Sequence, residues 1–157
     1  MIQRKQTLFL LFAVVALILV AFFPIVKFYG DFSYILKVFS FDDMSKTQTY
    51  AYSITNNLPI IILWSLPLIL SIVTIFLFKK RKLQMRLISI SIILLSVLLL
   101  FLFLFYTPKI ESLFNVKAEY HKCISLYLLL FSIIMLIFSY RGVNKDEKLV
   151  KSLDRLR

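Results

Sequence analysis

Four long, uncharged runs of apolar residues divide this chain. They cover residues 7–26, 58–78, 87–106 and 123–140, and none contains Asp, Glu, Lys, Arg or His. Crossing a hydrocarbon layer about 30 Å thick takes about 20 residues of helix, and each run is close to that length. Helices are expected because a segment in lipid must satisfy its own backbone hydrogen bonds. The pattern therefore predicts an all-α membrane protein, a bundle of four transmembrane helices formed by residues 1–157 as one integral membrane domain.

The first apolar run has a competing interpretation as a cleaved signal peptide, because the basic residues Arg4 and Lys5 precede it. No small-residue cleavage motif follows, since Phe22, Phe23 and Pro24 stand at that place. The run is also longer than the roughly 7–15 apolar residues of a signal peptide. We therefore expect a retained membrane anchor.

The charge of the chain is distributed unevenly between the two sides that these spans define. Hydrophobic residues make up 61% of the chain and the net charge is +11. The N-terminus, residues 79–86 and residues 141–157 together hold 13 basic and 3 acidic residues, whereas residues 27–57 and 107–122 hold 6 basic and 5 acidic residues. Because Lys and Arg accumulate in cytoplasmic loops, both termini and residues 79–86 are predicted to be cytoplasmic. Most of the basicity is then explained by topology.

The outer loop of residues 27–57 is too long for a simple connection. Residues 32–41 and 50–54 are rich in aromatic and β-branched residues, and the polar residues 42–49 separate them. This arrangement predicts a small β-hairpin cap on the outer face. A short interfacial helix is the alternative, because Tyr and Phe also favour the membrane–water boundary.

The tail of residues 141–157 has the pattern of a short cytoplasmic amphipathic helix. Asn144 followed by Glu147 fits a capping box. Three leucines share one helical face and basic residues flank it: Leu149, Leu153 and Leu156, with Lys148, Lys151 and Arg155. Three interpretations stay open, namely a helix lying on anionic lipid, a helix docked on a cytoplasmic partner, and a frayed, solvated tail.

No catalytic or metal-binding group is visible in the sequence. His121 is the only histidine and Cys123 the only cysteine, and side chains two residues apart do not face each other on a helix. One His and one Cys cannot provide the ligands of a zinc site. The spans lack the ionisable residues typical of ion-coupled carriers. We therefore expect a protein that is not an enzyme and has no cofactor and no metal.

Both ends of the chain contain recognisable sequence. The chain opens with Met1-Ile2-Gln3-Arg4 followed by Gln6-Thr7, and it ends with residues 146–152 (DEKLVKS) and 154–157 (DRLR). Together with the four-span layout, this resembles a Bacteroidota family of small inner-membrane proteins, the domain of unknown function family 4293. The resemblance extends over the whole chain. It implies a bacterial inner membrane, with residues 27–57 and 107–122 in the periplasm, and it implies no activity.

The sequence leads to one main functional hypothesis and one alternative. The main hypothesis is a non-enzymatic accessory or scaffold subunit of an inner-membrane complex, and the alternative is a protein that handles a lipid or small molecule in a cleft between the helices. The expected partners are anionic lipid headgroups and another membrane or cytoplasmic protein, with nucleic acid only as part of an RNA-containing machine. The residues expected to bind a partner or lipid are Arg4, Lys5, Lys79, Lys80, Arg81, Lys82, Arg86, Lys148, Leu149, Lys151, Leu153, Arg155, Leu156 and Arg157.

Overall fold

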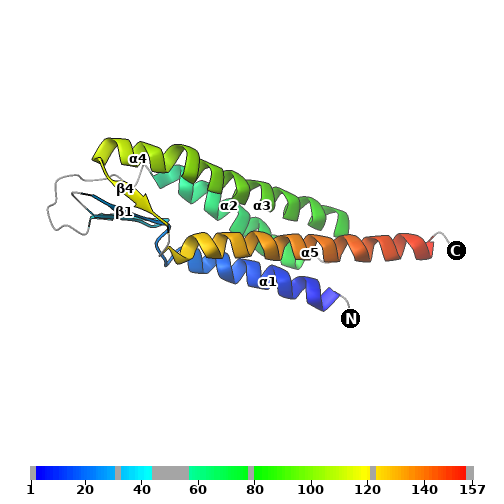
Figure 1. Cartoon of the computed structure of the whole chain (residues 1–157). Coiled ribbons are helices and arrows are strands. Elements are labelled where there is room, and N and C mark those ends of the chain that lie inside the picture. Colours follow the sequence, from blue (N-terminus) through cyan, green and yellow to red (C-terminus); the bar gives the residue numbers. More distant parts are fainter. Residues whose placement is uncertain (1–2, 31–32, 44–56, 78–79, 121–122, 155–157) are drawn as a thin grey trace.

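The structure is a computed structural model, and it describes residues 3–30, 33–43, 57–77, 80–120 and 123–154 (Figure 1). Most of these residues are helical. The helical segments are α1 (Gln3–Val20), α2 (Leu58–Phe76), α3 (Arg81–Phe101), the π-helical segment η2 (Leu102–Tyr106), α4 (Thr107–Phe114) and α5 (Ile124–Asp154).

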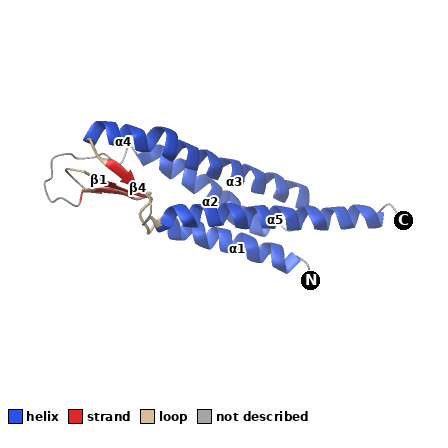
Figure 2. Ribbon diagram, viewed as in Figure 1, coloured by secondary structure: helices blue, strands red, loops and turns tan. Residues whose placement is uncertain are grey.

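The long helices pack side by side into a bundle. Helix α1 contacts α2 and α5, and α3 also contacts α2 and α5, so the four long helices close a ring. The strands lie at one end of the bundle, and both termini lie at the other end (Figure 2). We call these the sheet end and the terminal end.

A small antiparallel sheet forms at the sheet end. Its strands are β1 (Val26–Tyr29), β2 (Tyr34–Leu36), β3 (Phe41–Asp43) and β4 (Lys117–Glu119), in the order β3-β2-β1-β4. Lys27 of β1 lies opposite Ile35 of β2 on one side and Glu119 of β4 on the other. Because β4 follows α4 while the other strands follow α1, the sheet joins the two segments that connect the long helices at this end.

A small β structure is present as predicted, but its strands differ from the predicted ones. The predicted strand of residues 32–41 is divided by a turn, in which the Lys37 N–H donates to the Ser40 carbonyl at 2.8 Å. Asp42 was expected in a polar turn, but it belongs to β3 and accepts a hydrogen bond from Lys37 Nζ at 2.9 Å. The predicted second strand of residues 50–54 lies outside the described residues.

The first helix ends earlier than the apolar run predicts. Helix α1 stops at Val20, and Val26, the predicted end of the span, begins β1. Pro24 lacks an N–H and disfavours helical geometry at Phe23, which explains why the helix does not resume. The Ile25 N–H donates instead to the Leu36 carbonyl at 2.8 Å. The apolar residues after Val20 therefore enter the sheet and its approach.

Three helical stretches in the described residues are long and apolar enough to cross a membrane: Leu58–Phe76, Arg81–Leu113 and Ile124–Val150. Gln6–Val20 is a shorter apolar helix. The predicted loop of residues 107–122 begins with helix α4, which continues α3 through η2. The predicted connection of residues 79–86 is likewise helical from Arg81 onward.

The helix that contains the fourth predicted span continues beyond residue 140. Helix α5 runs without interruption through Asn144 to Asp154, so the predicted capping box at Asn144 and Glu147 is wrong. A cap is needed only where backbone N–H groups lack a preceding helical turn, and here that turn is present. Gly142 lies inside the helix, where a Cβ atom would come within 2.7 Å of Gln6 Cγ.

Polar and apolar side chains are arranged in the bundle as lipid requires. The hydroxyl residues Ser71, Thr74, Ser91, Ser125, Ser132 and Ser139 are buried. Large apolar side chains cover the outside, including Ile69, Ile93 and Ile134. Small residues inside a bundle let membrane helices approach closely, and helices that are apolar all round need an apolar surrounding. The chain is therefore a membrane protein by the length, composition and surface of its helices.

Candidate functional site

Helix α5 extends past the start of α1 at the terminal end of the bundle (Figure 1). Its 31 residues span about 46 Å at 1.5 Å per residue, whereas a hydrocarbon layer is about 30 Å thick. In Figure 1 the red end of α5 continues past the beginning of α1. The last turns of α5 therefore project from the terminal end of the bundle.

A cluster of polar side chains fixes the base of this projection. Gln6 Nε2 donates a hydrogen bond to Asp146 Oδ2, and Arg81 Nη1 donates to the Asp146 carbonyl at 3.3 Å. Ser139 Oγ lies 3.5 Å from the Gln6 carbonyl oxygen and donates to it. These residues, Gln6, Arg81, Ser139 and Asp146, are called the polar anchor below. The anchor ties α5 to both α1 and α3.

Asp146 and Glu147, at the base of the projection, face inward rather than toward solvent. Asp146 is 7% exposed and Glu147 is 9% exposed. Helix α1 comes close to α5 at Gly142, which faces Gln6. Asp146 lies one turn after Gly142 on α5, so Gln6 reaches its carboxylate. Burial of a carboxylate is unfavourable unless hydrogen bonds compensate it. Gln6 supplies such a bond to Asp146 Oδ2, whereas Asp146 Oδ1 has no partner among the residues that the structure describes.

Beyond the polar anchor, apolar and basic side chains are exposed together. Leu149 is 46% exposed and Val150 is 41% exposed. Lys148 and Ser152 are exposed beside them. An apolar pair next to a lysine on a projecting helix is suited to binding another surface.

The structure separates the predicted binding residues into groups. Lys80, Lys82 and Arg86 are exposed at the start of α3, as partner binding requires. Arg81, by contrast, is half-buried and bonds to α5, so it has an internal structural role. Two further groups are described less fully. The backbone of Arg4, Lys5, Lys151 and Leu153 is helical but their side chains lie outside the described part, and Lys79, Arg155, Leu156 and Arg157 lie outside it altogether.

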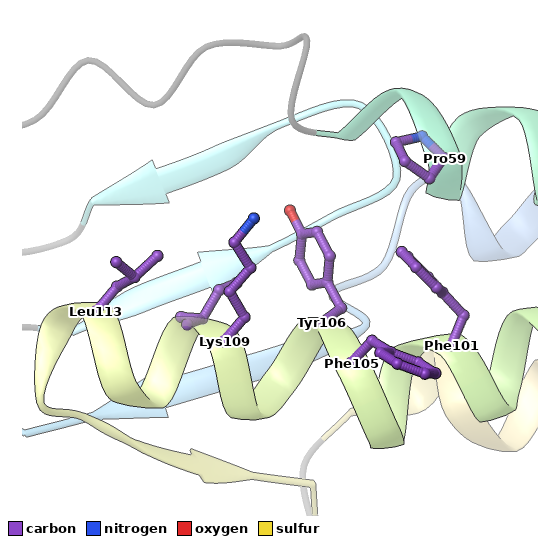
Figure 3. A pocket seen from close by; sticks show the side chains of 7 residues that line it. Pro59, Phe101, Phe105, Tyr106, Lys109 and Leu113 are labelled. Atoms are coloured by element: carbon purple, nitrogen blue, oxygen red, sulfur yellow. The ribbon is translucent and has the colours of Figure 1, made fainter.

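A groove that sequence reasoning missed lies at the sheet end, between the start of α2 and the continuous helix α3–η2–α4. Its cavity has a volume of about 500 Å³. Figure 3 shows its lining side chains. We call it the α2–α4 groove, and its lining residues are Pro59, Phe101, Phe105, Tyr106, Lys109, Ile110 and Leu113.

The π-helical segment positions the lining of this groove. Pro108 cannot donate to the Leu104 carbonyl, so the regular helical hydrogen bonding is interrupted there. The Thr107 N–H donates to the Leu102 carbonyl five residues earlier, and Thr107 Oγ1 donates to the same oxygen at 2.8 Å. On a regular α-helix, residues four apart rotate gradually around the helix axis. The wider π-helical turn counteracts this rotation, so Phe101, Phe105 and Lys109 lie along one stripe of the helix surface.

A buried hydrogen bond closes the inner side of the groove. Tyr106 Oη donates to Asn57 Oδ1, which joins the π-helical segment to the residue before α2. Asn57 is 1% exposed, and its Nδ2 has no acceptor among the residues that the structure describes. The Tyr106 hydroxyl is therefore committed to the fold, and Lys109 is the charged group that the groove offers to a ligand.

A second, smaller cavity of about 260 Å³ lies between α3 and α5. Its lining is aliphatic and aromatic, consisting of Leu99, Phe103, Tyr120, Leu126, Tyr127 and Leu130. It contains no charged side chain.

Cys123 lies just before α5 and is buried. Its Sγ donates to the Glu119 carbonyl at 3.4 Å, so the buried thiol is held within the fold. His121 lies outside the described residues. Within the described ranges, no three His, Cys, Asp or Glu side chains gather where they could hold a metal ion.

Comparison with known proteins gives one match. The family described as "Domain of unknown function (DUF4293)" matches residues 2–156, which include both ends of the chain. No curated protein matches the chain. No solved structure matches it either.

Proposed function

We propose that this chain, which belongs to the DUF4293 family, is a non-enzymatic accessory subunit of a bacterial inner-membrane complex that docks a partner on the projecting end of α5. In this proposal the chain crosses the membrane four times with both termini in the cytoplasm. The charge distribution supports that orientation, because the basic residues gather at the terminal end. Helix α1 and the apolar residues after it complete the first crossing.

The observation that carries this proposal is the continuity of α5 through the polar anchor. A helix that lies on lipid must run in the membrane plane, which would require a bend after the fourth span. Helix α5 has no interruption between Ile124 and Asp154, and Asp146 holds it against α1 and α3. The exposed Leu149 and Val150 are thereby directed away from the bundle, which favours docking on a protein groove over lying on lipid.

The test combines Leu149→Asp with Val150→Asp in the full chain. Charged side chains in place of the apolar pair remove the contact surface, while the polar anchor and the membrane helices stay intact. We expect normal amounts of protein in the membrane and loss of a stoichiometric partner on purification in mild detergent. Ser152→Asp is the control, because it adds one negative charge nearby, half of the charge that the double variant adds, without removing an apolar side chain.

Two outcomes would overturn the proposal. One is a wild-type protein that purifies at its own mass from native membranes. The other is a double variant that keeps its partner in wild-type amount. A partner lost from the Ser152→Asp control and the double variant alike would show that charge alone, rather than apolar contact, decides binding.

The second candidate function is the handling of a lipid between the helices. The α2–α4 groove supports it, because a cavity of about 500 Å³ falls within the roughly 300–1,000 Å³ of ligand pockets. Its lining is mainly apolar, as such pockets are.

A further inference from the structure

We infer that the α2–α4 groove binds an anionic glycerophospholipid, with one acyl chain along Phe101 and Phe105 and the phosphate at Lys109. This inference rests on the second candidate function and names its ligand class. It does not depend on the docking of a partner at the other end of the bundle.

The depth of the groove in the membrane is the first argument. The uncharged run of residues 87–106 is 20 residues long and covers about 30 Å as a helix. Phe101 and Phe105 therefore lie at the edge of the hydrocarbon layer, and Lys109 lies one turn beyond it. Pro59 marks the start of α2 at the same level, since Asn57 is bonded to Tyr106. The groove crosses the boundary between acyl chains and headgroups.

The chemistry of the lining follows the same boundary. Phe101 and Phe105 present aromatic surface, and Phe105 is 67% exposed. Lys109 is exposed, and no ion pair joins it to a carboxylate in the described part of the chain. Figure 3 shows the Lys109 ammonium and the Tyr106 hydroxyl pointing to the same side of the helix. A ligand that satisfies both parts must be apolar at one end and anionic at the other.

A phospholipid is the occupant that meets these requirements. A lysine at the membrane surface attracts the negatively charged headgroup of an anionic lipid. The Tyr106 hydroxyl is already donated to Asn57, so recognition of the head relies on the charge of Lys109. We therefore expect the groove to prefer lipids with a net negative charge over zwitterionic lipids. The cavity between α3 and α5, by comparison, has no basic side chain in its lining and offers no charge to a lipid headgroup.

The experiment is native mass spectrometry of the full-length protein, delipidated in detergent and titrated with phosphatidylglycerol or phosphatidylcholine. We expect one retained phosphatidylglycerol and weaker retention of phosphatidylcholine. Lys109→Glu removes an attraction and adds a repulsion, so it should weaken phosphatidylglycerol binding about tenfold and change phosphatidylcholine little. Phe105→Ala should weaken both lipids, because it removes surface that contacts the acyl chain.

Matched controls separate the groove from general effects. Lys117→Glu makes the same charge change at an exposed site on β4, outside the groove. Leu104→Ala shortens an exposed apolar residue next to Phe105 that does not line the cavity. Both controls should bind phosphatidylglycerol as the wild type does.

Equal retention of the two lipids, with no effect of Lys109→Glu, would overturn the inference and indicate ordinary lipid packing around the bundle. Retention of a second copy of the chain in place of lipid would overturn it as well. An assay of lipid transfer between vesicles distinguishes lipid binding in the groove from the lipid-handling function proposed above. Tightly bound phosphatidylglycerol that is not transferred between vesicles would uphold the site and refute lipid handling.

Discussion

At the scale of single residues, Asp146 connects three helices of the bundle. Its side chain accepts from Gln6 of α1, and its backbone carbonyl accepts from Arg81 of α3. Gly142 makes the first of these bonds feasible, because any side chain there would displace Gln6. The inward position of Asp146 is thus the result of one small residue and two donors on different helices.

Replacement of Asp146 by Ala should destabilise the protein by about 1–3 kcal/mol, because the buried Gln6 amide loses its acceptor. Asp146→Asn should cost less, since a carboxamide oxygen can still accept that bond. The midpoint of thermal unfolding in one detergent measures both changes. Lys145→Ala, at an exposed position on the same turn, should stay within about 0.5 kcal/mol of the wild type. Equal losses for Asp146→Ala and Lys145→Ala would refute the structural role of the anchor.

At the scale of elements, the helix formed by α3, η2 and α4 is continuous but not regular. Its irregular turn coincides with Thr107 and Pro108, where the hydroxyl of Thr107 bonds to the carbonyl of Leu102. Leu102, Tyr106 and Thr107 are all buried around this turn. The two ends of the π-helical segment, Leu102 and Tyr106, therefore face the interior, whereas its middle residues, including Phe105, are exposed. The stripe that lines the α2–α4 groove follows from this turn.

Thr107→Val should destabilise the protein by about 0.5–1.5 kcal/mol, because it removes the hydroxyl hydrogen bond while keeping the shape of the side chain. The control is Ser112→Ala, which removes a similar bond to the Lys109 carbonyl at an exposed position of α4. That control should change stability by less than about 0.5 kcal/mol. Unfolding midpoints compare the two, and a larger loss for Ser112→Ala would contradict a stabilising role for the bond at the π-helical turn.

At the scale of the whole molecule, the two ends of the bundle differ in structure and in charge. The sheet end joins β1 to β4 across a long sequence separation, and the terminal end gathers the basic residues of α3 and α5. Both ends of the chain lie at the terminal end (Figure 1). An even number of membrane crossings would produce this arrangement.

Single cysteines at exposed lysines test the orientation. In a Cys123→Ser background, Lys117→Cys should react with a membrane-impermeant maleimide in intact spheroplasts. Lys82→Cys and Lys145→Cys should react only in inverted vesicles, because positive charge is retained in the cytoplasm. All three positions are exposed, so access differs by side and not by burial. Labelling of positions 82 and 145 from opposite sides would contradict the four-span arrangement.

Much of the candidate sites could not be predicted from the sequence, for a physical reason that differs between the ends. At the terminal end, Lys80, Lys82 and Leu149 were predicted as surface residues and are exposed. Arg81 was grouped with them because its charge resembles theirs, although it bonds to α5. At the sheet end, the sequence did not indicate Lys109 as a binding residue. The opposite wall of its groove is formed by Pro59, which is 50 positions away in the chain.

The sequence by itself determined which apolar segments form the helices and that they need lipid, but not where α1 and α5 end. This is a local property, because each segment in a membrane must be apolar and must satisfy its own backbone over about 20 residues. Helix α2 accordingly begins where the second run begins, at Leu58. Only the tertiary structure decided the pairing of β1 with β4, the inward turn of Asp146 and the α2–α4 groove. Each of these joins residues far apart in the chain, and contacts of that kind depend on how the helices pack rather than on the composition of any one segment.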